Sequence, residues 1–143
     1  MPAMRTKEFL ELLPDLLRQQ LPENLADFQV AHRITSLTKF YYSQPSFHYE
    51  VWIQKRRKEV ELGLHFESDP DSNLEQLDLL REKADQIHGS LGDEVELHEW
   101  DRGWTRAHET LELDPLDDDF LVEISFRLSA MIQTFEPILR GES

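Results

Sequence analysis

The chain has 143 residues, of which 39% are hydrophobic and 31% are charged, so it carries enough apolar material to fold around one core. Its 29 acidic and 15 basic side chains give a formal net charge of −14, which repels phosphate backbones and anionic lipids and argues against direct nucleic-acid binding and membrane association. Cysteine is absent from the sequence, which excludes disulfides, thiol catalysis and thiolate metal sites and favours a cytoplasmic location.

We expect a single domain over residues 1–143, and its first predicted element is an amphipathic helix over residues 6–21. Leucine and phenylalanine recur there at spacings of three and four, with charged residues between them, which predicts neither a signal peptide nor a membrane anchor. Pro14 interrupts this pattern. Either the helix kinks there, or it begins near Leu13 and holds Pro14 in its first turn.

Residues 28–67 change to the period of two that is typical of strands. The alternation from Phe28 predicts a first strand that continues irregularly toward Tyr42 and ends before Pro45. A clearer alternation over residues 48–67 predicts a hairpin that turns at Arg56-Arg57. In this register every buried position meets an apolar partner: Ile53 lies opposite Val60, Val51 opposite Leu62, and Tyr49 opposite Leu64. A slip of one residue would lose all of these pairs.

The second half of the chain is predicted to contain a helix, a hairpin and another helix. These are a helix over residues 71–90 after the capping sequence Asp69-Pro70-Asp71-Ser72, a hairpin over residues 93–112 around Asp101-Arg102-Gly103, and a closing helix that follows Asp117 and ends near Pro137. The resulting order, α-β-β-β-α-β-β-α, predicts an α+β fold in which an antiparallel sheet carries helices packed on one face.

The predicted registers place histidines on the sheet face that points away from the helices. His48 faces His65 in the first hairpin, and the second hairpin pairs His98 with Arg106 and Glu96 with His108. Two imidazoles with Glu61 or Glu96 nearby would suit zinc, so one hypothesis is a metal-dependent hydrolase centred on His48, His65, His98 and Glu61, with His48, His65 and Glu61 as the candidate metal ligands. The alternative is that these are ordinary polar residues of a half-exposed face. We assign no catalytic residue and no cofactor.

The three tryptophans occupy the same polar face. Trp52 lies in the first hairpin, and Trp100 faces Trp104 in the second. Exposed aromatic area of this kind marks a protein interface, and a symmetric homodimer is the commonest form that it takes. Alternatively, Trp100 and Trp104 stack on each other, or a loop covers one of them. The basic run from Lys55 to Lys58 is either a solvated turn or a local contact for an acidic partner or a phosphate.

Residues 58–108 carry a further pattern. It consists of the strand Val60–Phe66, a helix with Asn73, Leu77, Leu80, Lys83 and Ile87, the run Leu91-Gly92-Asp93-Glu94, and then Trp100, Asp101-Arg102 and Arg106. This pattern resembles a bacterial domain family of unknown function that is found alone or at the C-terminus of restriction-endonuclease-like proteins. The resemblance implies an accessory or recognition module with no catalytic residues of its own, and it adds Arg106 to the three tryptophans as a predicted partner-binding residue.

The element order, size and acidity of the chain are also similar to those of the dimeric chaperones of bacterial type III secretion, at the level of fold. We therefore expect a non-catalytic protein-binding or accessory module that forms a homodimer. The alternatives are an accessory subunit of a bacterial DNA restriction or defence system, and the metal-dependent hydrolase.

Overall fold

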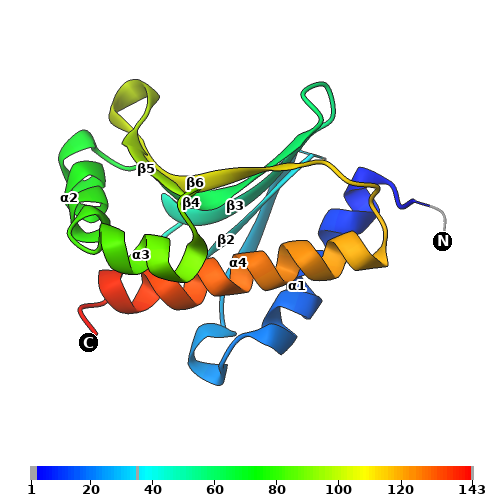
Figure 1. Ribbon diagram of the computed structural model, residues 1–143, viewed down its shortest axis with the longest axis horizontal. Coiled ribbons are helices and arrows are strands. Elements are labelled where there is room, and N and C mark those ends of the chain that lie inside the picture. The colour runs from blue at the N-terminus through cyan, green and yellow to red at the C-terminus, as the bar shows by residue number, and fades with distance from the viewer. Residues whose placement is uncertain (1–2, 35, 143) are drawn as a thin grey trace.

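The computed structural model describes residues 3–34 and 36–142 and consists of an antiparallel sheet with helices packed on one side (Figure 1). The elements are α1 (Thr6–Gln20), β1 (Gln29–Ile34), β2 (Leu37–Tyr41), β3 (Phe47–Gln54), β4 (Glu59–Phe66), α2 (Pro70–Arg81), α3 (Ala84–Leu91), β5 (Glu96–Glu99), β6 (Thr105–Glu112) and α4 (Asp118–Leu139), with short 3-10 turns at Glu23–Leu25 and Asp101–Gly103. The sheet has six strands in the order β1-β2-β3-β4-β6-β5. The structure confirms the predicted α+β fold.

Both predicted hairpin registers are confirmed. The apolar pairs of the first hairpin are those expected: Ile53 with Val60, Val51 with Leu62, and Tyr49 with Leu64. In the second hairpin β5 pairs with β6, with His98 opposite Arg106 and Glu96 opposite His108. The sheet also joins β4 to β6, although α2, α3 and β5 separate them in the chain. This non-local pairing brings the polar residues of the two hairpins onto one continuous surface.

Two predicted elements are each divided in the structure. The irregular strand predicted from Phe28 to Tyr42 is two antiparallel strands, β1 and β2; Thr35, between them, lies outside the described residues. The sequence did not predict this reversal, because the connection lacks the Gly, Asn or Asp that is typical of a tight turn. The helix predicted over residues 71–90 is two helices, because the backbone leaves helical geometry at Lys83 (φ −112°, ψ 23°). Apolar spacing continues across this break, so the pattern gave no sign of it.

Both long helices contain a proline. α1 continues through Pro14, so the alternative start near Leu13 is wrong. α4 continues through Pro137 to Leu139, past its predicted end. Its start is as predicted, because the side chain of Asp117 accepts a hydrogen bond of 2.9 Å from the backbone N–H of Phe120.

The core lies between the sheet and the helices. Helix-facing residues of β3 and β4, among them Val51, Leu62 and Phe66, are completely buried. They pack against apolar stripes that comprise Phe9, Leu13 and Leu17 of α1 and Ile124, Leu128, Met131, Ile132 and Phe135 of α4. Each such side chain contributes about 1.5–3 kcal/mol when it leaves water, which is why the two periodicities predict the fold. Within the described ranges, no helix has the length and apolar character that a bilayer span requires.

One ion pair is buried on the helix side of the sheet. Glu109 of β6 lies opposite Leu62 and is 3% exposed, so its carboxylate would be unfavourable there without a partner. Arg127 of α4 donates hydrogen bonds to both oxygens of this carboxylate, and to the carbonyl oxygen of Leu91 at the end of α3. The hydrogen bonds to Glu109 raise the pKa of Arg127. This contact fixes α3 and α4 against β6.

Candidate functional site

The open face of the sheet, which points away from the helices, is polar yet largely buried. It carries Lys39 of β2, His48, Glu50 and Trp52 of β3, Glu61, Gly63 and His65 of β4, Arg106, His108 and Thr110 of β6, and Glu96 and His98 of β5. In the described part of the chain no helix lies over this face, although the β3–β4 and β5–β6 turns rise above it (Figure 1). His48 is nevertheless 1% exposed, His65 0% and Glu61 5%. The polar side chains therefore bury one another.

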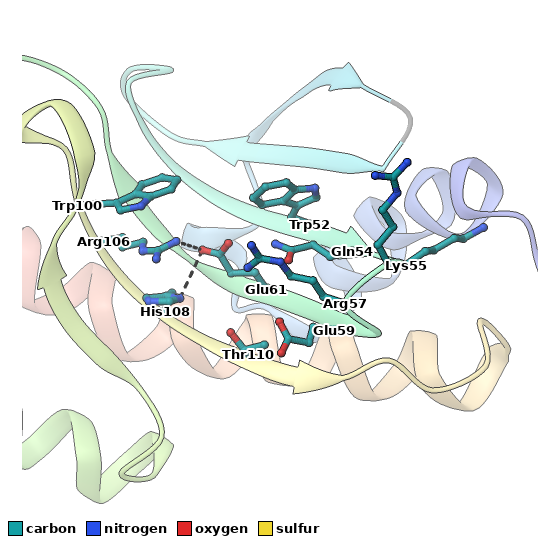
Figure 2. Close-up of a pocket in the computed structure, with 11 residues that line it drawn as sticks. Trp52, Gln54, Lys55, Arg57, Glu59, Glu61, Trp100, Arg106, His108 and Thr110 are labelled. Atoms are coloured by element: carbon teal, nitrogen blue, oxygen red, sulfur yellow. Dashed lines mark hydrogen bonds and ion pairs between the residues drawn. The ribbon is translucent and has the colours of Figure 1, made fainter.

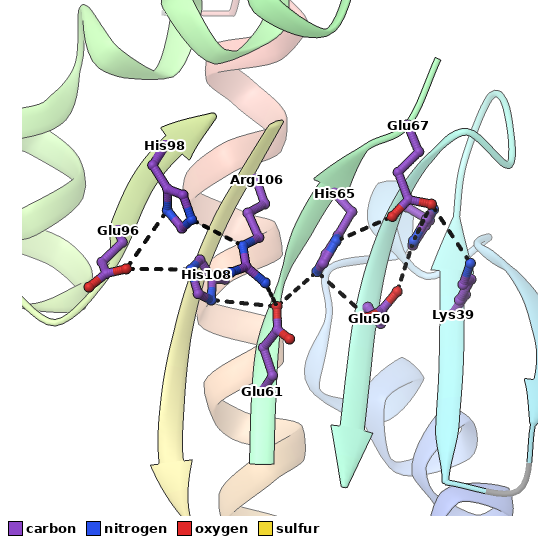
Figure 3. A network of polar contacts seen from close by, with 10 residues as sticks. Lys39, Glu50, Glu61, His65, Glu67, Glu96, His98, Arg106 and His108 are labelled. Carbon is purple, nitrogen blue, oxygen red and sulfur yellow. Dashed lines mark hydrogen bonds and ion pairs between the residues drawn. The ribbon is translucent and has the colours of Figure 1, made fainter. Parts of the chain in front are cut away.

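Carboxylates alternate with basic groups along the open face (Figure 3). The contacts in order are Lys39 Nζ to Glu67 Oε1 (3.9 Å), His48 Nε2 to Glu50 Oε1 (3.1 Å), His65 Nε2 to Glu61 Oε1 (3.1 Å), and Arg106 to the same Glu61 oxygen (3.0 Å). Arg106 also donates to His98 Nε2 at 3.2 Å. Glu61 thus joins a histidine of β4 to an arginine of β6.

Gly63 makes room for this network. It lies between Glu61 and His65 on the open face of β4, and the side chains of these two residues meet above it. Its neighbours in the sheet are Glu50 of β3 and His108 of β6. A Cβ at this position would press against His108 and the carbonyl oxygen of Ala107 in β6.

The network gives its histidines opposite charge preferences. Burial would lower the pKa of His65, but the carboxylates of Glu61 and Glu67 outweigh it and raise that pKa to about 9. Burial and the positive charge of Arg106 lower the pKa of His108 to about 4. Although burial opposes ionisation of Glu61, His65 and Arg106 hold its pKa below the usual value. At neutral pH the face therefore holds an ionised carboxylate between a cationic and a neutral imidazole.

A groove of about 530 Å³ opens beside this network, between the β3–β4 turn and the β5–β6 turn (Figure 2). Its lining consists of Trp52, Gln54, Lys55, Arg56, Arg57, Glu59, Glu61, Trp100, Arg106, His108 and Thr110. The guanidinium carbon of Arg106 lies 4.1 Å from the centre of the Trp100 ring, a cation–π contact. The groove therefore combines two indole rings with a basic lip, in a chain whose net charge is −14.

The structure brings three of the four predicted partner-binding residues together at the groove: Trp52, Trp100 and Arg106. Trp104 lies beside it, with its ring centre 6.2 Å from that of Trp100 and with Arg102 over its face. The two indoles of the second hairpin do contact each other, as the alternative interpretation expected. Trp100 is nevertheless 38% exposed, so this contact does not remove it from solvent.

The predicted histidine pair is also in place. The rings of His48 and His65 stack with centres 5.6 Å apart and planes within 6° of parallel. Sequence reasoning missed Glu50 and Glu67, each of which offers an oxygen close to these imidazoles. Each glutamate follows one of the histidines by two residues, so the strand period was a signal that could have found them. A second group of possible metal ligands consists of Glu96, His98 and His108.

The groove is equipped for binding. Its basic lip attracts anions, and its indole rings accept planar or apolar groups. Glu61, one of the two carboxylates in its lining, already accepts hydrogen bonds from Arg106 and His65 and so is not free to act as a base. Comparisons of the chain with protein-family models, with curated proteins and with solved structures found no match.

Proposed function

We propose that this chain is a non-catalytic module that binds another protein chain in the groove on the open face of its sheet. The observation that supports this most directly is the 38% exposure of Trp100, a ring that Arg106 stacks against and that Trp52 accompanies along the groove. Tryptophan and arginine are the residue types that most often dominate the energy of protein interfaces. A ring already held in place also loses little conformational entropy when a partner binds.

The charge of the groove selects the chemistry of the partner. Lys55, Arg56 and Arg57 are exposed at its lip, where they form a local positive patch on an acidic protein. Glu61 does not cancel this patch, because Arg106 and His65 already compensate its charge. The partner segment is therefore acidic, with apolar or aromatic side chains that contact Trp52 and Trp100.

A second copy of the chain is the first partner to test. Symmetric pairs are the commonest assemblies of soluble chains, and each copy brings exposed carboxylates at Asp114, Asp118 and Asp119. Sedimentation velocity across the micromolar range tests this self-association. Selection from a random peptide library tests other acidic partners.

One substitution and its control test the groove, whether the partner is a second copy of the chain or a peptide. We expect Trp100→Ala to weaken binding of the partner about 30-fold, which corresponds to about 2 kcal/mol at an interface hot spot. Phe126→Ala is the matched control, because this ring is 68% exposed but belongs to α4, on the helix side of the sheet. A monomer that selects no peptide would contradict the proposal, as would peptides that bind the Trp100→Ala variant as tightly as the unaltered chain.

A further inference from the structure

Two stacked histidines, His48 and His65, lie close to two glutamates on the open face, and Figure 3 labels His65, Glu50 and Glu67 of this group. One donor atom from each of His48, Glu50, His65 and Glu67 lies within 4.8 Å of the other three. We propose that these four residues, the His-Glu cluster, bind a zinc ion. The cluster is separate from the groove, whose lining includes none of the four. The inference therefore goes beyond the proposed function.

The hydrogen bonds of His48 fix which of its nitrogens is available. Nδ1 lies 2.9 Å from the carbonyl oxygen of Pro45, and because a carbonyl can only accept, Nδ1 carries the ring hydrogen. Nε2 then points at another acceptor, the Glu50 carboxylate, at 3.1 Å. Two acceptors at this distance repel each other unless a proton or a metal ion lies between them. The ring is thus oriented as in many metal sites, where the outer nitrogen donates to a backbone carbonyl.

His65 is held in the same way by a carboxylate. Its Nε2 lies 3.1 Å from Glu61 Oε1, an oxygen that Arg106 also fixes. The other nitrogen, Nδ1, is buried and makes no hydrogen bond, although it lies 3.5 Å from Glu67 Oε2. A histidine that a carboxylate anchors on one side, and whose other nitrogen is turned toward a further carboxylate, matches the second-sphere arrangement of a zinc ligand, and zinc takes the place of the hydrogen on Nδ1.

The spacing and charge of the cluster also fit zinc. Zinc bonds of 2.0–2.2 Å place tetrahedral ligand atoms about 3.3–3.6 Å apart. The contacts of the cluster lie around this range: His48 Nε2 is 3.1 Å from Glu50 Oε1 and 3.9 Å from Glu67 Oε1, and His65 Nδ1 is 3.5 Å from the other Glu67 oxygen, Oε2. A small adjustment of these side chains would bring one oxygen of each glutamate to the ion. Two carboxylates balance the double charge of the ion, so both rings can bind it in their neutral form.

The second histidine group is less suitable. His98 Nε2 accepts a hydrogen bond from Arg106, so in the neutral ring Nδ1 carries the hydrogen and cannot bind a metal. Arg106 also places a positive charge next to that group, which opposes a cation. The third member, Glu96, is exposed. The His-Glu cluster is therefore the metal site that the geometry favours.

The ion at this site is structural. Four protein donors complete a tetrahedron and leave no coordination position for a substrate or a catalytic water. The ion ties β3, which carries His48 and Glu50, to β4 and to Glu67 just beyond its end. This differs from the metal-dependent hydrolase hypothesised from the sequence, because Glu61 orients His65 rather than binding the ion.

Titration of chelator-treated, untagged protein with zinc alone, in competition with a chromophoric chelator, tests the proposal. We expect one saturable zinc ion per chain, and binding at least about 100-fold weaker in Glu67→Gln. Glu96→Gln is the matched control, because it makes the same change beside the other pair of histidines, and we expect its affinity to be unchanged. The absence of saturable binding to the unaltered chain would overturn the proposal. So would loss of binding in Glu96→Gln with full binding in Glu67→Gln.

Imidazole nitrogen chemical shifts identify the ligands without altering the fold. Zinc should shift Nε2 of His48 and Nδ1 of His65, whereas shifts confined to His98 and His108 would refute the assignment. Lys39→Met should bind zinc several-fold more tightly, because the ammonium of Lys39 lies 3.9 Å from Glu67 and competes with the ion. Arg57→Ala alters the lip of the groove and should leave zinc binding unchanged, so failure of the groove and failure of the cluster are distinguishable.

Discussion

Replacement of Gly63 by alanine tests whether the close approach of β4 to β6 is required. An ideal Cβ at this position would lie 2.4 Å from His108 Cβ, 2.6 Å from the carbonyl oxygen of Ala107 and 2.7 Å from His108 Cα. Two of these atoms belong to the backbone of β6, so no change of rotamer relieves the clash. The strands must separate, which strains the ladder between them. Overpacking of this kind costs about 3 kcal/mol, and at about 3 °C per kcal/mol for a domain of this size the melting temperature falls by about 10 °C.

Gly89→Ala makes the same chemical change where there is space. Gly89 lies in α3, is exposed, and has no atom within 4 Å of an ideal Cβ. Alanine favours the helix, so we expect this variant to gain about 0.5–1 kcal/mol. Thermal melts followed by circular dichroism, with urea titrations, compare the two variants. A Gly63→Ala variant whose free energy of unfolding lies within about 1 kcal/mol of the unaltered chain would show that the close approach of the strands is not a constraint.

Two further substitutions test the buried charges on either side of the sheet. Arg127→Met leaves Glu109 buried without a partner, so the free energy of unfolding measured in urea should fall by about 3–5 kcal/mol. Adding Glu109→Gln to this variant should restore part of the loss. A loss below about 1 kcal/mol in Arg127→Met would contradict the prediction. The pKa of His108 is about 4 in the folded chain against an ordinary 6.5, so between these values only the unfolded chain binds the proton. Stability should therefore fall by about 2–3 kcal/mol as pH drops through this window, and His108→Gln should lack that part of the loss. If the difference in free energy of unfolding between the unaltered chain and His108→Gln does not change with pH, this prediction is refuted.

The hairpins could be predicted because their registers depend on local pattern. Moving β3 by one residue against β4 would turn Val51 and Ile53 away from the core, so alternation alone specifies the pairing. The division of the first strand and of the second helix could not be predicted in this way. At the reversal between β1 and β2 no Gly, Asn or Asp marks the change, and at Lys83 the apolar spacing continues through the break. The local pattern therefore does not specify the backbone geometry at either place.

The candidate site was only partly predictable for a related reason. Pairing within each hairpin places His48 against His65, and this could be predicted from spacing. The contact of Glu61 with Arg106 depends on β6 lying next to β4, which no local pattern specifies. The same strand order brings Trp52 and Trp100 to one groove. The polar residues themselves could be identified from the sequence, but the long-range order of the strands could not be predicted from it.

Glu61 links the two proposed sites, and stability alone does not explain why a charge is buried there. A buried ion pair rarely stabilises a fold more than apolar residues of the same volume, yet Glu61 is 5% exposed and ionised. Its contacts instead fix groups that binding requires: Arg106 against Trp100 in the groove, and His65 toward the His-Glu cluster. Glu61→Gln should therefore weaken the binding of both zinc and the groove's partner about 10-fold or more. Glu67→Gln should weaken only zinc binding, and Arg57→Ala, at the lip of the groove, only partner binding. Zinc and peptide titrations of the three variants measure this pattern, and a Glu61→Gln variant that keeps either affinity intact would show that the two sites are not linked through this carboxylate.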